Sequence, residues 1–364
     1  MLSLASKQDL SVCKGRGRMQ LRNAENVYST KLKRAGVLLV AGLCSASTFA
    51  QTDAVSKDLD VYALGRDAVS LSQGPAAKVW PGLATLEPGF VVIDGDLEVA
   101  VCRDAAPGFE PVRNSPIDGC TAFERPRVFP EAMQASLNLF GQEETVMVSP
   151  PETLGQDVLH WTLLFVHERF HQLQSTFPDY HARIDALDLS AGDQTGMWML
   201  TRPFPYEDPS IEKQVNKVSK MLVQLVRSTE PSLLRDYIAL RQQLLDSLSA
   251  GDQRYFEFQL WKEGTARWTE IAVARTLATS EHPDAAAFDR LAKRGIADVV
   301  SVLGKTDLGA LGRGWFYAAG AAEWLIIDRL DPTWRARYPT GPLAAGPYLE
   351  ALSVPCSADC GEDS

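Results

Sequence analysis

Two histidines and a glutamate form the most specific chemical pattern in this chain. His167, Glu168 and His171 make an HExxH sequence in a segment whose apolar residues recur at helical spacing. On a helix, residues four apart lie on one face, so both imidazoles can meet one metal ion. Glu168 lies beside the open coordination position, where its carboxylate can take a proton from an activated water. Zinc (Zn2+) suits such a set when one more protein ligand joins it.

An amphipathic helix with two partly exposed histidines and a surface glutamate is the alternative explanation. The five residues before His167 read TLLFV. This apolar run indicates a buried helix, in which unpaired histidines would cost free energy. The chain has only five histidines, so chance seldom places two of them at this spacing. The pattern therefore favours a metal site.

A third ligand is expected downstream, where residues 261–268 read WKEGTARW inside a helical stretch over 252–279. HExxH followed by E-G-x-A-x-aromatic resembles the gluzincins, metallopeptidases of the zincin fold whose third zinc ligand is a Glu on a later helix. By this resemblance Glu263 is the third ligand, and Gly264 would let its helix approach the histidine helix closely. Glu270 stays open as an alternative ligand or as a hydrogen-bond partner of a ligand histidine. A plain amphipathic helix is the other explanation of this segment.

A tyrosine further along the chain extends the resemblance. Residues 315–320 read WFYAAG. Aminopeptidase-type gluzincins carry Tyr-x-x-Gly at the start of a helix after the ligand Glu, and that Tyr donates a hydrogen bond to the oxyanion of the tetrahedral intermediate. The resemblance thus assigns Tyr317 as oxyanion donor, with Gly320 three residues on, and a phenol suits this role. Packing in an aromatic core beside Trp315 and Phe316 remains an equal alternative.

The other histidines show weaker patterns. His160 lies seven residues before His167 and so shares its helical face. We expect it to be structural or to form a hydrogen bond near the site. His181 and His282 fall in loop or helix-end positions, from which either could replace Tyr317 as oxyanion donor. Solvation is the commoner role of such histidines.

Two arginines near the motifs have more than one explanation. Arg267 lies in the segment that carries the expected ligand, and Arg313 lies just before the expected tyrosine helix. Either guanidinium could bind a substrate carboxylate. In an acidic protein, pairing of an arginine with Asp or Glu is the commoner role.

Residues 1–50 are expected to be an export signal rather than part of the fold. Basic residues at positions 31, 33 and 34 precede an uncharged run of 16 residues, AGVLLVAGLCSASTFA, and the run ends in small residues that fit cleavage before Gln51. The run is too short and too rich in small residues for a membrane span. The stretch before Met19 indicates an over-long start. We therefore expect an exported protein, periplasmic or secreted, with no stable membrane span after cleavage.

Four cysteines follow the expected signal, and an even number in an exported protein favours disulfides. Proximity in the sequence pairs Cys102 with Cys120 and Cys356 with Cys360, although four cysteines permit three pairings. A cysteine zinc site is the alternative, but no CxxC pair occurs.

The composition is that of a globular protein and excludes some partners. The chain has 364 residues, 45% hydrophobic and 23% charged, and its formal net charge is −10. Of the 36 basic and 46 acidic residues, residues 1–50 hold eight and two, which leaves 28 against 44, or −16, in residues 51–364. Such an acidic body repels phosphate backbones and anionic lipids, so we expect no nucleic-acid partner.

The pattern along the chain predicts an α+β fold with a small N-terminal β-containing part and a mostly helical, zincin-like body. Residues 90–102 read FVVIDGDLEVAVC, in which an Asp-Gly turn separates two apolar runs and predicts a hairpin. A proline-rich stretch follows up to residue 130. Helical spacing then recurs over 153–175, 211–228, 232–249, 252–279, 285–303 and 312–330. We expect a β-rich part over 51–130 and a catalytic body over 131–364.

These patterns predict an exported zinc-dependent peptidase that acts on a peptide or protein substrate with Glu168 as general base. The 91 residues between His171 and Glu263 would include an inserted helical unit, about 183–250, that could form a lid or a substrate wall. The GxMEN sequence of the aminopeptidases is absent upstream of HExxH, so no N-terminal specificity is assigned. The alternatives are a non-catalytic envelope binding or assembly factor of the same fold and a zinc hydrolase of other amides or esters.

Overall fold

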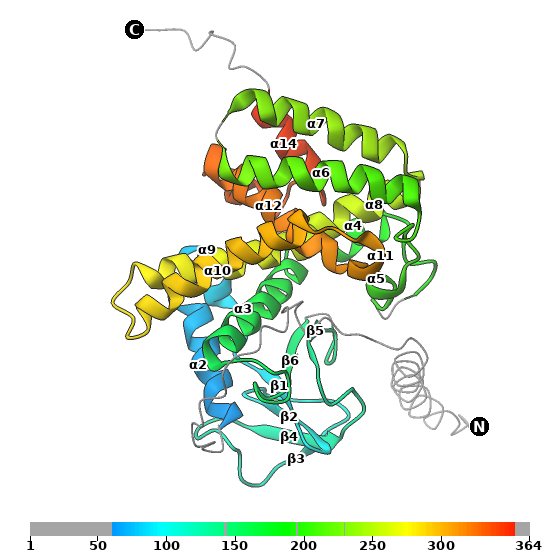
Figure 1. Ribbon diagram of the computed structural model, residues 1–364. Coiled ribbons are helices and arrows are strands. Elements are labelled where there is room, and N and C mark those ends of the chain that lie inside the picture. The colour runs from blue at the N-terminus through cyan, green and yellow to red at the C-terminus, as the bar shows by residue number, and fades with distance from the viewer. Residues whose placement is uncertain (1–59, 142–143, 194–195, 229, 354–364) are drawn as a thin grey trace, which may run out of the picture.

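The computed structural model describes residues 60–141, 144–193, 196–228 and 230–353. The first element, α2 (Val61–Gln73), begins after Asp60, whose side chain accepts hydrogen bonds from two backbone N–H groups of the first turn. Two short 3-10 helices, η1 (Pro75–Lys78) and η2 (Pro81–Thr85), lead into the sheet. Figure 1 shows the sheet at one end of the molecule, with α2 beside it and most of the helices stacked at the other end.

Six strands of the described chain form one mixed sheet in the order β3-β4-β2-β1-β6-β5. They are β1 (Phe90–Asp94), β2 (Leu97–Val101), β3 (Glu110–Pro111), β4 (Ala122–Pro126), β5 (Gln134–Leu137) and β6 (Thr145–Val148). β1 and β2 form the predicted hairpin, and Gly95 adopts a φ of +57° in its turn. β1 and β6 are parallel, whereas the other neighbouring strands are antiparallel. β5 is the last strand in this order and is therefore an edge strand of the sheet.

The β-containing part differs in extent from the expected range of 51–130. It includes a helix, α2, and the sheet continues to residue 148 because β5 and β6 belong to it. β6 joins the sheet by pairing with β1, more than fifty residues earlier in the chain. Such long-range pairing leaves no local turn signal in the sequence.

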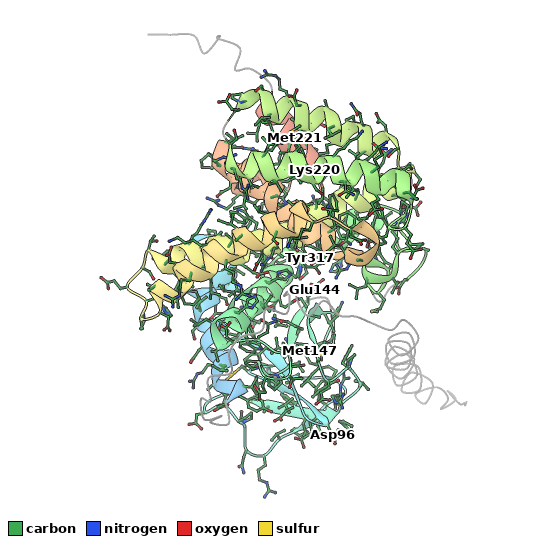
Figure 2. All side chains as sticks on the ribbon, in the orientation of Figure 1. Asp96, Glu144, Met147, Lys220, Met221 and Tyr317 are labelled. Carbon is green, nitrogen blue, oxygen red and sulfur yellow. A yellow bond between two sulfur atoms is a disulfide. The ribbon has the colours of Figure 1, made fainter. Side chains whose placement is uncertain are left out.

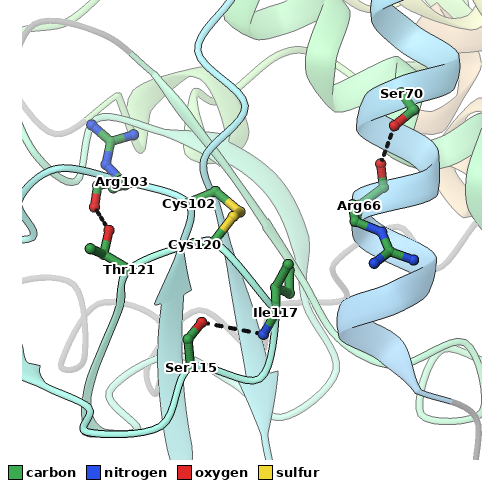
Figure 3. Close-up of a disulfide and its surroundings, with 8 residues drawn as sticks. All are labelled: Arg66, Ser70, Cys102, Arg103, Ser115, Ile117, Cys120 and Thr121. Carbon is green, nitrogen blue, oxygen red and sulfur yellow. Dashed lines mark hydrogen bonds between the residues drawn. A yellow bond between two sulfur atoms is a disulfide. The ribbon is translucent and has the colours of Figure 1, made fainter.

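A disulfide joins Cys102 and Cys120, which confirms that predicted pair (Figure 3). Cys102 follows β2 with a φ of +55°, and Cys120 lies two residues before β4. The bond closes the loop that connects these two neighbouring strands. The other predicted pair, Cys356–Cys360, and the expected signal at 1–50 lie outside the described residues.

The rest of the described chain is helical, which confirms the α+β class. The remaining elements are α3 (Val158–Ser175), α4 (Tyr180–Asp185), α5 (Trp198–Thr201), α6 (Pro209–Arg227), α7 (Pro231–Asp246), α8 (Ala250–Gln259), the π-helical turn η3 (Leu260–Gly264), α9 (Thr265–Ala278), α10 (Ala285–Gly304), α11 (Leu308–Leu311), α12 (Gly314–Leu330), α13 (Trp334–Arg337) and α14 (Gly346–Ser353). Across the described ranges, no helix combines the length and the hydropathy that crossing a bilayer requires.

α3 separates two hydrophobic cores. Trp161 and Phe165 pack with the sheet and α2, whereas Leu163, Val166 and Phe170 pack into the larger core of the helical part. Both faces of the helix are therefore buried, as the TLLFV run indicated. Figure 1 shows α3 between the sheet and the remaining helices. The HExxH sequence thus lies at the junction of the two parts.

The helices within the expected insertion at 183–250 are part of the larger core. α6 contacts α7, α10 and α12, and its buried residues face that core. α6 begins at Pro209 after Asp208, whose side chain accepts hydrogen bonds from the first turn. Among the described residues of this region, those that line the cavity belong to the end of α4, to Asp193 and to residues 196–200.

Candidate metal centre

Three side chains bring one donor atom each to a common point. His167 and His171 come from α3, and Glu263 comes from the π-helical turn η3. The two Nε2 atoms are 3.1 Å apart, and Glu263 Oε2 lies 3.2 Å from His171 Nε2 and 3.7 Å from His167 Nε2. All three residues are buried, and together they could hold a metal ion.

These spacings fit the size of a small cation. Around a tetrahedral ion with ligand bonds of about 2.0–2.2 Å, neighbouring donor atoms lie about 3.3–3.6 Å apart. The three observed separations, 3.1, 3.2 and 3.7 Å, are close to this range. The side chains therefore need little movement to coordinate such an ion.

The tautomer of His171 follows from a chain of hydrogen bonds. Tyr338 donates its O–H to the backbone oxygen of Trp261 at 2.8 Å, so its own oxygen is free to accept from Gln174 Nε2, also at 2.8 Å. This fixes Gln174 Oε1 as the acceptor for His171 Nδ1, again at 2.8 Å. Nδ1 therefore carries a proton, and Nε2 is the ring nitrogen that faces the common point.

The same reasoning applies to His167. Its Nδ1 lies 2.8 Å from Glu270 Oε1, and Arg267 holds the other oxygen of that carboxylate. Although burial opposes ionisation of Glu270, Arg267 and His167 lower its pKa, so it accepts from Nδ1–H. The structure thus brings Glu270 to the far nitrogen of the histidine and Glu263 to the common point. Of the two roles that the sequence left open for Glu270, its position fits the hydrogen-bond partner.

The two Nε2 atoms and Glu263 Oε2 therefore converge on a place that one shared cation can occupy. A cation satisfies such a set, and a proton competes with it for the same atoms. Burial lowers the pKa of His167, but the carboxylates of Glu263 and Glu270 outweigh it and raise this pKa to about 10. The charges that favour a proton here also favour a metal ion.

The helix that carries Glu263 has one irregular turn at the ligand. α8 and α9 would form one continuous helix, but η3 inserts a π-helical turn over Leu260–Gly264. π-Helical structure in proteins occurs mostly as single turns within an α-helix, and many of these turns lie at functional sites. The sequence predicted the helical stretch over 252–279 correctly but gave no sign of this turn.

Gly264 does permit a close helix approach, but to a different helix from the one expected. A Cβ added to Gly264 would lie 2.4 Å from the Cα of Gly320 in α12, and one added to Gly320 would lie 2.5 Å from the Cα of Gly264. The expectation that Gly264 lies against the histidine helix is wrong. The two glycines of the EGxA and YxxG sequences instead face each other, which places Tyr317 beside Glu263.

Tyr317 lies at the site, with its ring stacked on that of His167 at a centroid distance of 6.0 Å. Its hydroxyl accepts a hydrogen bond from Arg313 Nη2 at 2.8 Å. Burial raises the pKa of Tyr317 well above its usual range; Arg313 opposes this effect and Glu263 adds to it. The phenol therefore keeps its proton and can donate it. It is not part of the aromatic core that Trp315 and Phe316 join.

Arg313 pairs with a carboxylate, the commoner of the two roles considered for it. Its Nη1 lies 3.2 Å from Glu263 Oε1, the oxygen that faces away from the histidines. One guanidinium thus contacts both the third donor residue and Tyr317. Arg267 is likewise paired, with Glu270.

Glu168 lies on the wall of a cavity of about 780 Å³ that opens at the donor atoms. Burial raises the pKa of Glu168, and the two neighbouring histidines oppose this rise. A buried carboxylate with a raised pKa is a stronger base than an exposed one. This is the environment that proton transfer in a cleft requires.

The remaining histidines lie outside the donor set. His160 lines the cavity, and burial lowers its pKa. His181 also lines the cavity, with its ring 5.2 Å from that of Tyr180. His282 follows α9 and packs on Phe288, and it is not part of the cavity wall.

Four residues of the site were not singled out from the sequence. Gln174 and Tyr338 set the tautomer of His171, and Lys262 and Tyr180 form part of the cavity wall. Gln174 has a possible local signal, since it follows His171 by three residues on one helical face. Tyr338 comes from a distant segment, so the sequence gives no spacing that connects it to the site. Lys262 directly precedes Glu263 and Tyr180 follows His171 by nine residues, but neither belongs to the sequence patterns that indicated the site.

Comparisons of the chain with protein-family models, with curated proteins and with solved structures find no match. The chemistry of the site is therefore argued from its geometry.

Proposed function

We propose that this chain is an exported zinc-dependent peptidase of the gluzincin type. The observation that carries the proposal is the convergence of two histidine Nε2 atoms and one carboxylate oxygen, with both tautomers set by hydrogen bonds. The set lies at the wall of a large cavity that also contains Glu168. The disulfide fits an oxidising compartment outside the cytoplasm.

Each residue then has a defined task. His167, His171 and Glu263 would hold zinc. A zinc ion held there would supply a Lewis acid, which polarises a carbonyl oxygen and lowers the pKa of water. Glu168 accepts a proton at its carboxylate and passes it to the leaving nitrogen. Tyr317 donates its O–H to the oxygen that becomes negative, and Arg313 holds the phenol in place.

The edge of the sheet supports a peptide as the substrate. All four residues of the edge strand β5 line the cavity. Gln134 Nε2 and Ser136 Oγ are buried without a hydrogen-bond partner among the described residues. An extended chain can pair with an open strand edge through main-chain hydrogen bonds, while side chains beside it add contacts.

Replacement of the proposed base tests the proposal. In Glu168→Gln, the zinc ligands are unchanged, so we expect one zinc per chain by elemental analysis. Cleavage of a peptide library should fall by about 10²–10⁴-fold, because proton transfer is lost. Glu152→Gln, at an exposed residue, should keep full activity.

Three results would count against this assignment. Undiminished hydrolysis by Glu168→Gln would reject the base, and zinc binding without cleavage of any peptide would favour an envelope binding or assembly factor. Cleavage of esters or small amides but not of peptides would indicate a different zinc hydrolase. Recovery of the protein from the periplasm or the medium, with its N-terminus at Gln51, tests the export.

A further inference from the structure

A buried lysine lies on the cavity wall next to the donor atoms. Lys262 directly precedes Glu263 and is 7% exposed. Its Nζ donates a hydrogen bond to Tyr180 Oη at 3.0 Å and lies 4.0 Å from Glu144 Oε1, beyond hydrogen-bond length. An ammonium has three N–H donors, and all three residues line the cavity. Lys262 therefore has donor capacity left for a bound group.

Glu144 brings an acceptor to the same part of the wall. It directly precedes β6, and its Oε2 is buried with no hydrogen-bond partner among the described residues. Figure 2 shows Glu144 just below Tyr317, where the sheet meets the helices. A buried carboxylate oxygen without a partner costs free energy, so a group that donates to it would bind favourably.

The opposite charges of this pair indicate which group fits between them. A carboxylate would be attracted by Lys262 but repelled by Glu144. An ammonium would be attracted by Glu144 but repelled by Lys262. A neutral amide offers a carbonyl oxygen to Nζ and an N–H to Oε2 at the same time. Because both partners are charged, each of these hydrogen bonds is of the stronger kind.

We propose that Lys262, Glu144 and Tyr180 form a subsite that binds an amide group of the substrate. The amide belongs either to the side chain of Asn or Gln or to the main chain of the peptide. This inference rests on the proposed peptidase function, because it assigns a specificity subsite beside its metal site. Lys262 and Glu144 contact the substrate directly, and Tyr180 positions the lysine.

Binding of a random hexapeptide library to zinc-loaded Glu168→Gln tests the subsite without turnover. Affinity selection and mass spectrometry should show Asn and Gln enriched at one position by about tenfold over Asp, Glu, Lys and Arg, if the side chain is the source. If the main chain is the source, no residue is enriched, but N-methylation of one peptide bond should weaken binding by about tenfold. Absence of both effects overturns the inference.

Two isosteric variants in the same background should change the preference in opposite directions. Lys262→Met removes the positive charge and leaves the negative charge of Glu144 unopposed, so Lys and Arg should become the enriched residues at that position. Glu144→Gln removes the negative charge and leaves the positive charge of Lys262 unopposed, so Asp and Glu should become enriched. With a main-chain amide, Glu144→Gln should reduce the sensitivity to N-methylation, because the neutral amide oxygen accepts a weaker hydrogen bond than the carboxylate. Lys262→Met keeps the acceptor of the N–H, so it should weaken binding of the unmodified peptide but retain the sensitivity to N-methylation. A merely structural role would weaken all peptides equally and would produce no such reversal.

Tyr180→Phe is a milder variant for the case in which Lys262→Met does not fold. It removes only the acceptor that holds Nζ, so the amide preference should weaken without a change in the preferred charge; an unchanged preference in all folded variants overturns the subsite. Cleavage of the same library by the wild type separates the two proposals. Binding that shows either the residue preference or the sensitivity to N-methylation, without cleavage, would reject the peptidase and retain the subsite. Cleavage that shows neither effect would retain the peptidase and reject the subsite.

Discussion

The two carboxylate oxygens of Glu263 contact different side chains. Oε2 lies 3.2 Å from His171 Nε2, and Oε1 lies 3.2 Å from Arg313 Nη1. The arginine therefore leaves one oxygen for a metal ion and limits rotation of the carboxylate. It also donates to Tyr317, so a single side chain orients a donor residue and the expected oxyanion donor.

Loss of this arginine should weaken metal binding without removing a ligand. In Arg313→Met, Glu263 can rotate away from the histidines, and we expect zinc affinity to fall by about 10–100-fold, as for other hydrogen-bond partners of metal ligands. Competition with a chromophoric zinc chelator measures the affinity directly.

Arg66→Met is the matched control for that measurement. Arg66 lies on α2 with its side chain 55% exposed, at 3.5 Å from Asp67, and it is not part of the cavity wall. Exposed pairs of this kind contribute little, so its zinc affinity should equal that of the wild type. Equal affinity in Arg313→Met as well would show that the guanidinium does not hold the carboxylate.

The residues of the donor set could be predicted because their spacing is local and their type is unusual. Two histidines four apart are brought together by any helix, and the EGxAxW sequence indicated Glu263. The tautomer of His171 could not be predicted, because it depends on Tyr338, 164 residues from Gln174. Lys262 was missed for a different reason. Lysines are almost never buried, so its type and position gave no sign of a role in the cavity.

Among the secondary-structure elements, the backbones of η3 and α12 are in close contact beside the site. Alanine at Gly264 would favour the helix by about 1 kcal/mol on propensity alone. However, its Cβ would lie 2.4 Å from the Cα of Gly320, and a backbone atom cannot move aside as a flexible side chain can. We therefore expect Gly264→Ala to be destabilised by about 1–3 kcal/mol, the range for overpacking, and to bind zinc less tightly. Urea unfolding and zinc titration measure the two effects.

Gly304→Ala separates packing from propensity. Gly304 ends α10, and an added Cβ there meets no atom within 4 Å. The same substitution should leave stability unchanged or raise it by about 0.4–1 kcal/mol. If both variants gain stability, the close approach of η3 and α12 is not a constraint.

The elements were predictable where the signals are local. α6 and α8 begin after capping residues Asp208 and Ser249, and their apolar spacing defined the helices within a few residues. The β1–β2 hairpin followed from its Asp-Gly turn. The parallel pairing of β6 with β1 and the π-helical turn were missed, because both depend on contacts between distant segments.

For the whole molecule, the position of α3 links metal binding to stability. α3 packs on the sheet with one face and on the helical core with the other, and it carries His167 and His171. Glu263 belongs to a helix within the helical core. An ion held by all three would connect these segments in the folded chain but not in the unfolded one.

The temperature of unfolding should therefore depend on zinc. With free zinc about a thousandfold above its Kd, the folded state gains about 4 kcal/mol. For a chain of this size, that gain corresponds to a rise in Tm of about 6 °C, measurable by calorimetry before and after treatment with EDTA. Glu168→Gln should show the full rise because its ligands are intact, and His171→Ala should lose most of it. An equal rise in His171→Ala would mean that zinc binds elsewhere, since removal of one of three ligands must weaken a site built from all three.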